Sequence, residues 1–192
     1  DKLRNTLRTT LIDIWEYVIP IWKISGLFKS IKSKKDLENF IQERSAHVSQ
    51  TTLYGYLKTR IGVKYIAMME DEVFLKSINI AKWNIYVVAL ADCAFYVFSY
   101  LISEKNLKKN DCKEIFLNIL ENEKKNGLSD EIFDRGKKNF LERLDKVNFS
   151  NYHLNDPFKE SGQALYYWSP IADELKSLDK KIVLNSIHLK WG

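Results

Sequence analysis

Apolar residues recur along this chain at spacings of three and four positions, the period of an α-helix that buries one face. The first such seam consists of Leu7, Leu11, Ile14, Val18, Ile21 and Phe28. Ser25 interrupts the seam, and Pro20 predicts a kink or a division of the helix. A second apolar edge, which includes Trp15 and Trp22, widens the stripe. We expect residues 1–35 to form a helical arm that needs an apolar surface to lie on, either its own domain, a partner or a membrane interface.

Helix start and stop signals divide the remaining chain. Ser33 followed by Asp36 resembles a capping box that opens a long helix, and Gly62 predicts its end. A second long helix is expected over residues 72–103, and a third over residues 111–125, closed by Asn126 and Gly127. Ser129 is placed to cap the next helix.

A short helix is expected over residues 161–168, and Ser169 with Pro170 predicts the start of the last one. The apolar positions that we expect to face inward from this last helix are Ile171, Leu175, Leu178, Ile182 and Leu189.

The segment from Ile85 to Ile102 raises the question of a membrane span, because its only charged residue is Asp92. An ionised carboxylate near the middle of a span costs about 3 kcal/mol. We therefore interpret the segment as a central core helix. A buried Asp92 then needs a partner, such as a lysine, a tyrosine hydroxyl or a free backbone amide.

The composition agrees with helices throughout. The 192 residues include 45% apolar side chains but only 7 Gly and 3 Pro, and no hairpin signal occurs. We predict an all-α protein: an arm over residues 1–35 and a single helical bundle-like domain of about six or seven helices over residues 36–192. Two cysteines in predicted helices, Cys93 and Cys112, indicate reduced thiols, so we expect an intracellular protein, either soluble or peripheral to a membrane.

Charge is concentrated at the start of the chain. Residues 1–35 hold eight Lys and Arg against three acids, whereas the remainder has equal numbers of each sign. The formal net charge of +5 is therefore carried by the arm, and only the arm is expected to attract an anionic partner.

Motifs for catalysis are scarce. No G-x-S-x-G pentapeptide is present, and His153, in a predicted loop, is the one candidate base if the chain is an enzyme. Metal-ligand spacings and phosphate-binding glycine loops are also missing, and the acidic run Glu70, Asp71 and Glu72 fits a helix start. We expect no metal and no cofactor.

Binding residues are easier to nominate. Three consecutive aromatics, Tyr166, Tyr167 and Trp168, cannot all enter one core from a helix, so at least one is expected at a partner or ligand surface. In the arm, the candidates for the same role are Trp15, Trp22 and Lys23. A nucleic-acid alternative would use Lys58, Arg60, Lys64 and Tyr65, where an aromatic ring accompanies cations.

Two stretches, TTLYGYLKTRIGVKY (Thr51 to Tyr65) running into MEDEVFLKSINIAKW (Met69 to Trp83), and WSPIADELKSLDKKIVLNSIHLKW (Trp168 to Trp191), carry a resemblance to a known family. They are similar to an uncharacterised all-helical bacterial family, some members of which bear the label "esterase". The resemblance implies an intracellular protein of a bacterial cytoplasm or of an organelle of bacterial origin, without a defined reaction, and it carries over no catalytic residue.

These patterns favour a non-enzymatic helical adaptor or assembly subunit, whose partner is another protein or a second copy of the chain. A membrane surface contacted through residues 7–28 stays open. The alternatives are a small, esterase-like hydrolase of unknown substrate and an RNA- or DNA-binding protein.

Overall fold

The computed structural model describes residues 31–104 and 107–191, and within these ranges it contains helices and no β-strand. The helices are α2 (Lys34–Ile61), α3 (Tyr65–Met68), α4 (Glu72–Ser103), α5 (Lys109–Lys125), α6 (Asp130–Lys146), α7 (Lys159–Trp168) and α8 (Asp173–Trp191), with 3-10 turns η1 (Gly62–Lys64) and η2 (Tyr152–Leu154). The predicted all-α class is confirmed. Residues 1–30, with Trp15, Trp22 and Lys23 of the predicted arm, lie outside the described ranges.

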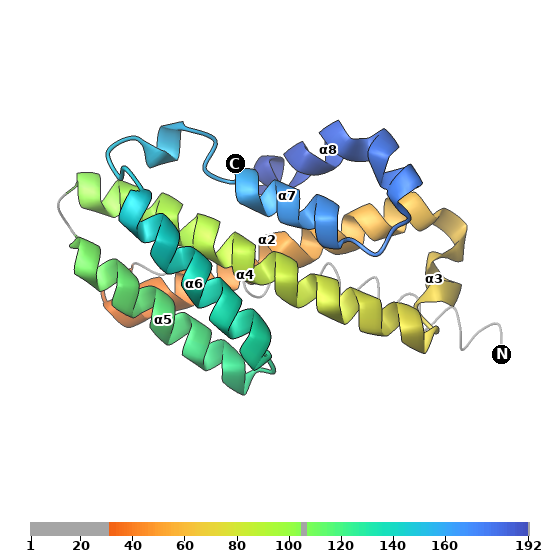
Figure 1. Cartoon of the computed structure of the whole chain (residues 1–192), viewed down its shortest axis with the longest axis horizontal. Helices are drawn as coiled ribbons and strands as arrows, with labels where there is room; N and C mark the ends of the chain where they lie inside the picture. Colours follow the sequence, from red (N-terminus) through yellow and green to blue (C-terminus); the bar gives the residue numbers. More distant parts are fainter. Residues whose placement is uncertain (1–30, 105–106, 192) are drawn as a thin grey trace.

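The core is organised around α4, which runs the length of the molecule beside α2 (Figure 1). One cluster of buried side chains joins α2 and α4 to α5 and α6, and includes Ile41, Phe95 and Phe116. A second cluster joins the other halves of α2 and α4 to α7 and α8, and includes Leu53 and Val183. Because α2 and α4 pass through both clusters, they form the scaffold on which the α5–α6 and α7–α8 pairs sit.

Helix α4 is long and apolar enough to cross a membrane by length and composition, but 67% of its most apolar window is buried inside the bundle. Its predicted range of 72–103 agrees with the structure, and the helix is continuous. The burial is what a central core helix requires, because its neighbours cover it on several sides.

The predicted capping residues lie where expected. The Ser33 hydroxyl accepts a hydrogen bond from the Asp36 amide at 3.1 Å and donates one to the Asp36 carboxylate at 2.9 Å. Ser129 accepts from the amide of Ile132 at the start of α6. Gly127, after the end of α5, has a φ of +104°, a conformation that side chains with a Cβ rarely adopt. Local sequence therefore determines these helix ends.

The predicted start of the last helix is wrong by a few residues. Helix α8 begins at Asp173, whereas Ser169 closes the preceding helix. Its hydroxyl donates a hydrogen bond to the Leu165 carbonyl at 2.6 Å, so the side chain satisfies the end of α7 instead of capping α8. Pro170 therefore lies in the connection between the two helices.

The predicted inward face of α8 is also wrong. Leu175, Leu178 and Ile182 are 44%, 76% and 72% exposed, whereas Val183 and Ile187 are buried. Ile171 precedes the helix and packs partly against the second cluster, as expected, and the side chain of Leu189 is not among those described.

Two contacts fix this rotation of α8. The first is the close approach of α7 at Gly162, where an added Cβ would lie 2.3 Å from the Leu184 carbonyl oxygen. The second is Asp179, which lies 3.2 Å from the Arg60 side chain and accepts a hydrogen bond from the Tyr56 hydroxyl. Both contacts depend on partners distant in sequence, so the apolar spacing of α8 could not reveal them.

Candidate functional site

The candidate base, His153, is held against the central helix by Ser99. The turn η2 places its Nδ1 atom 3.0 Å from the Ser99 hydroxyl, which itself lies 2.5 Å from the carbonyl oxygen of Phe149. A carbonyl can only accept, and a hydroxyl has one proton, so Ser99 donates to Phe149 and His153 donates to Ser99.

That proton arrangement is the reverse of the one a nucleophile needs. In a catalytic serine–histidine pair the hydroxyl donates its proton to the imidazole. Here the Ser99 proton is directed at a backbone carbonyl, and the Ser99 side chain is completely buried. The contact therefore anchors the loop that contains His153 to α4, and its geometry does not activate Ser99.

Asp92 lies at the junction of three helices and is fully buried. One carboxylate oxygen accepts from the Arg143 guanidinium of α6 at 2.6 Å. The other accepts from the backbone amide of Ser161 at 2.8 Å and from its hydroxyl at 2.6 Å. The expected backbone-amide partner is thus confirmed, and the cation is an arginine. The arrangement ties α4, α6 and α7 together.

Burial governs the ionisation of this centre. It raises the pKa of Asp92, although Arg143 and Ser161 oppose the rise, and it raises the pKa of Tyr152. The Tyr152 hydroxyl lies 3.0 Å from Arg143 and donates to the Pro157 carbonyl at 2.9 Å. Because the hydroxyls of Tyr152 and Ser161 both donate within the protein, the centre is suited to holding the fold.

A second buried acid, Glu123, joins α5 to α2 and α4. Its carboxylate accepts from the Tyr86 hydroxyl at 2.5 Å and from the Gln42 amide at 2.6 Å. Sequence reasoning missed Glu123 and Arg143. A signal for Glu123 exists, because it follows Phe116 and Leu120 at helical spacing on the apolar face of α5. Arg143 follows the buried Phe140 by three positions on α6, so helical spacing offered a signal for it as well.

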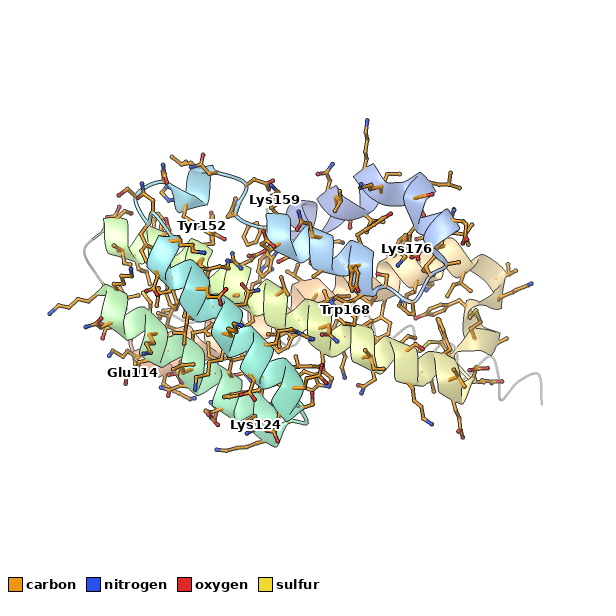
Figure 2. All side chains as sticks on the ribbon, in the orientation of Figure 1. Glu114, Lys124, Tyr152, Lys159, Trp168 and Lys176 are labelled. Carbon is orange, nitrogen blue, oxygen red and sulfur yellow. The ribbon has the colours of Figure 1, made fainter. Side chains whose placement is uncertain are left out.

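The three predicted aromatics at the end of α7 lie beside two fixed cations, and we call Tyr166, Tyr167, Trp168, Arg135 and Lys176 the α7 aromatic surface. Tyr167 is 71% exposed. It meets the half-buried Trp168 edge to face, with ring centres 5.1 Å apart. The Arg135 guanidinium lies 5.5 Å from the Trp168 ring, and the Lys176 ammonium lies 5.8 Å from the Tyr166 ring. Figure 2 shows Trp168 at the end of α7 and Lys176 near the start of α8.

Both cations are held in place. Arg135 donates to the side-chain oxygen of Asn84, on α4. Lys176 donates to the Tyr167 carbonyl at 3.3 Å and pairs with Asp173 at 3.0 Å. The surface is therefore built on three helices, α4, α6 and α7, and on the start of α8. Side chains already held in one conformation lose little entropy when a partner binds.

The four residues of the nucleic-acid alternative are not brought to one exposed surface. Lys58 and Lys64 are exposed, but Tyr65 is buried in the second cluster, where it cannot stack on a base. Arg60 pairs with Asp179 and donates to the Leu175 carbonyl, so it is used to position α8.

No three His, Cys, Asp or Glu side chains in residues 31–104 and 107–191 gather closely enough to hold a metal ion. In the acidic run at residues 70–72, Asp71 is the N-cap of α4 and accepts from the Phe74 amide at 2.8 Å.

Comparison with known proteins found no family model, no curated protein and no solved structure that matches this chain. The functional argument therefore depends on the geometry of the chain itself.

Proposed function

We propose that this chain is a non-enzymatic helical adaptor or assembly subunit that binds another protein through the α7 aromatic surface. The observation that carries the proposal is the exposure of Tyr167, 71%, beside a Trp168 that Arg135 and Tyr167 hold in place. Tyrosine, tryptophan and arginine are the residue types that dominate binding energy at protein interfaces.

The surface has the anatomy of an interface centre. Trp168 is half-buried, so its ring is rigid, while Tyr167 projects beyond it into solvent. A partner that covered Tyr167 would remove a large aromatic area from water without ordering a flexible chain. At a central anchor of this kind, truncation to alanine costs about 2 kcal/mol, or roughly 30-fold in affinity.

The hydrolase alternative has less support. Its candidate base donates to a buried serine whose proton is engaged with the Phe149 carbonyl. A membrane surface as the place of action would depend on residues 7–28, which lie outside the described ranges.

The test uses a matched pair of exposed tyrosines. Tyr100, near the end of α4, is 58% exposed and lies sixteen residues after Asn84, about 24 Å along the helix. A photoreactive benzoylphenylalanine replaces either Tyr167 or Tyr100 in the full chain, inside the cells that produce it. We expect a crosslink from position 167 to a defined protein, and none from position 100.

The alanine variants then measure the contact. With the crosslinked protein purified, Tyr167→Ala should weaken its binding about 30-fold, whereas Tyr100→Ala should change it less than about twofold. Equal crosslinking from both positions, or unchanged affinity in Tyr167→Ala, would refute the α7 aromatic surface as the interface.

A further inference from the structure

Helix α8 carries a row of aliphatic side chains that the described part of the chain leaves uncovered. Leu175, Leu178 and Ile182 follow one another at spacings of three and four and are 44%, 76% and 72% exposed. We call these three residues the α8 stripe. On its other side α8 packs against α7 and α2, and it forms an outer edge of the molecule in Figure 1. Spacings of this kind form a seam that a second helix can cover.

The α8 stripe is bordered by an edge with one acid and one base. Glu174 and Lys181 each precede a stripe residue by one position, so both lie on the same edge, and we call them the charged edge. Both residues are exposed, and within residues 31–104 and 107–191 neither forms an ion pair. The opposite edge contains Asp179, which pairs with Arg60 of α2 at 3.2 Å. The charged edge therefore lies on the side of the stripe away from α2.

The charged edge is complementary to a second copy of itself in one direction only. When two identical helices pair antiparallel about a two-fold axis, the same edges meet. Glu174 of each helix then faces Lys181 of the other, which gives two pairs of opposite charge. In a parallel pair opposite edges meet, and Glu174 would face Asp179 of the second helix, a repulsion between two acids. Because edge charges set the direction of helix pairing, they favour the antiparallel arrangement.

The apolar side chains agree with the same arrangement. A two-fold axis between Leu175 and Leu178 places each of these side chains level with the other one in the second copy. It also brings Ile182 beyond the start of the second α8, near the half-buried Ile171 of that copy. With a rise of about 1.5 Å per residue, the acid and the base of the two charged edges are then about 3 Å apart along the helix axis. One register therefore aligns the apolar row and the charges together.

We propose that the α8 stripe binds the α8 stripe of a second copy of this chain, with the two helices antiparallel. Large aliphatic side chains grouped in one row mark an interaction site, whereas single exposed ones do not. Interfaces below about 1,200 Å² of total buried area belong to weak complexes, and a contact centred on three side chains lies at this small end. The dimer is therefore expected to dissociate on dilution. The contact uses no residue of the α7 aromatic surface, so either proposal can fail without the other.

Charge exchange in the full chain tests this contact. Glu174→Lys and Lys181→Glu each turn both opposite-charge pairs of the dimer into like-charge pairs, whereas the double variant restores both pairs with the signs exchanged. The matched control, Glu142→Lys, makes the same change of net charge as Glu174→Lys at an exposed position of α6. Sedimentation equilibrium between about 5 and 500 µM chain measures the dissociation constant of each dimer.

We expect the unchanged chain to dimerise in this range and each single reversal to weaken the dimer about tenfold, because two exposed pairs change from attraction to repulsion. The double variant should return to within about threefold of the original dissociation constant, and the control should stay within about twofold. A chain that is monomeric throughout the range would overturn the proposal. A dimer that both single reversals leave intact, or that the double variant does not restore, would also overturn it.

A further variant removes the apolar contact. Leu178→Asp changes a side chain that is 76% exposed, so the chain is expected to stay folded, which circular dichroism checks. Two aspartates beside the two-fold axis should weaken the dimer at least about 30-fold. Tyr100→Asp, which changes a 58% exposed side chain of α4, should leave the dissociation constant within about twofold. Equal dimerisation of the two variants would contradict the α8 stripe as the interface.

Discussion

Gly162 sets the distance between α7 and α8, and replacing it tests whether that distance is needed for stability. A Cβ at this position would lie 2.3 Å from the Leu184 carbonyl oxygen, whereas ordinary contacts begin near 3.4 Å. Because the obstructing atom belongs to the backbone, a side-chain rotation cannot relieve the clash. Gly162→Ala therefore requires the two helices to separate locally by about 1 Å.

The expected cost follows from two opposing effects. Overpacking a well-packed contact costs about 1–3 kcal/mol, and a gap of about 1 Å weakens the contacts between Leu165 and its neighbours on α8. Alanine is favoured over glycine within a helix by about 1 kcal/mol. We expect Gly162→Ala to lower the free energy of unfolding by about 1–2 kcal/mol, and the melting temperature by about 3–6 °C.

Gly55 provides the matched control, because it lies inside α2 with no atom within 4 Å of an added Cβ. Gly55→Ala should raise the free energy of unfolding by about 0.5–1 kcal/mol, since only helix propensity acts. Urea titration followed by circular dichroism measures both variants. A Gly162→Ala protein as stable as Gly55→Ala would refute the reasoning that α7 and α8 touch at Gly162.

Three further predictions concern the buried polar groups. Asp92→Asn should lower the free energy of unfolding by about 1–3 kcal/mol in urea titrations, because the amide NH₂ group that replaces one carboxylate oxygen cannot accept from Arg143 or Ser161. Burial raises the pKa of Asp92 above 3.8, so the contribution of this titration to stability is fully present below about pH 4 and is lost as the pH rises through the raised pKa. The Asn variant should lack this fall in the free energy of unfolding with pH. An identical pH dependence in the two proteins would contradict the raised pKa of Asp92. A serine-directed fluorophosphonate should leave Ser99 unmodified in the folded chain, because the Ser99 hydroxyl proton is donated to the Phe149 carbonyl. Mass spectrometry of the peptides measures the labelling. Specific labelling of Ser99 would contradict this proton arrangement. Tyr86→Phe should destabilise the chain by about 1–3 kcal/mol in thermal melts, since Glu123 loses a buried donor, and should exceed the cost of Tyr56→Phe, whose hydroxyl bond is longer at 3.2 Å.

The aromatic part of the candidate site could be predicted from the sequence alone. Three aromatics in a row cannot all enter a core, and the structure leaves Tyr167 exposed while it half-buries Trp168. The cations beside them were not accessible. Arg135 comes from α6 and Lys176 from α8, and only the packing of four helices brings these side chains to the rings.

His153 is a second residue whose role depends on contacts that the sequence could not reveal. Its place in a loop near Asp156 made it a reasonable candidate base. Its partner Ser99, however, is 54 residues earlier in the chain, and the direction of the proton depends on a third group, the Phe149 carbonyl. A hydrogen-bond direction is a property of all the groups that meet at one point, so spacing along the chain could not supply it.

The sequence by itself determined the helical class, the extent of α4 and the capped ends at Ser33 and Ser129, because these depend on contacts within a few residues. It also required a partner for Asp92, since a buried charge without one is too costly. Only the tertiary structure decided that the partner is Arg143, and which face of α8 is inward. The apolar spacing of α8 alone does not determine which of its faces packs against the bundle. The contacts of Gly162 and Asp179, which join segments far apart in the chain, determine the buried face.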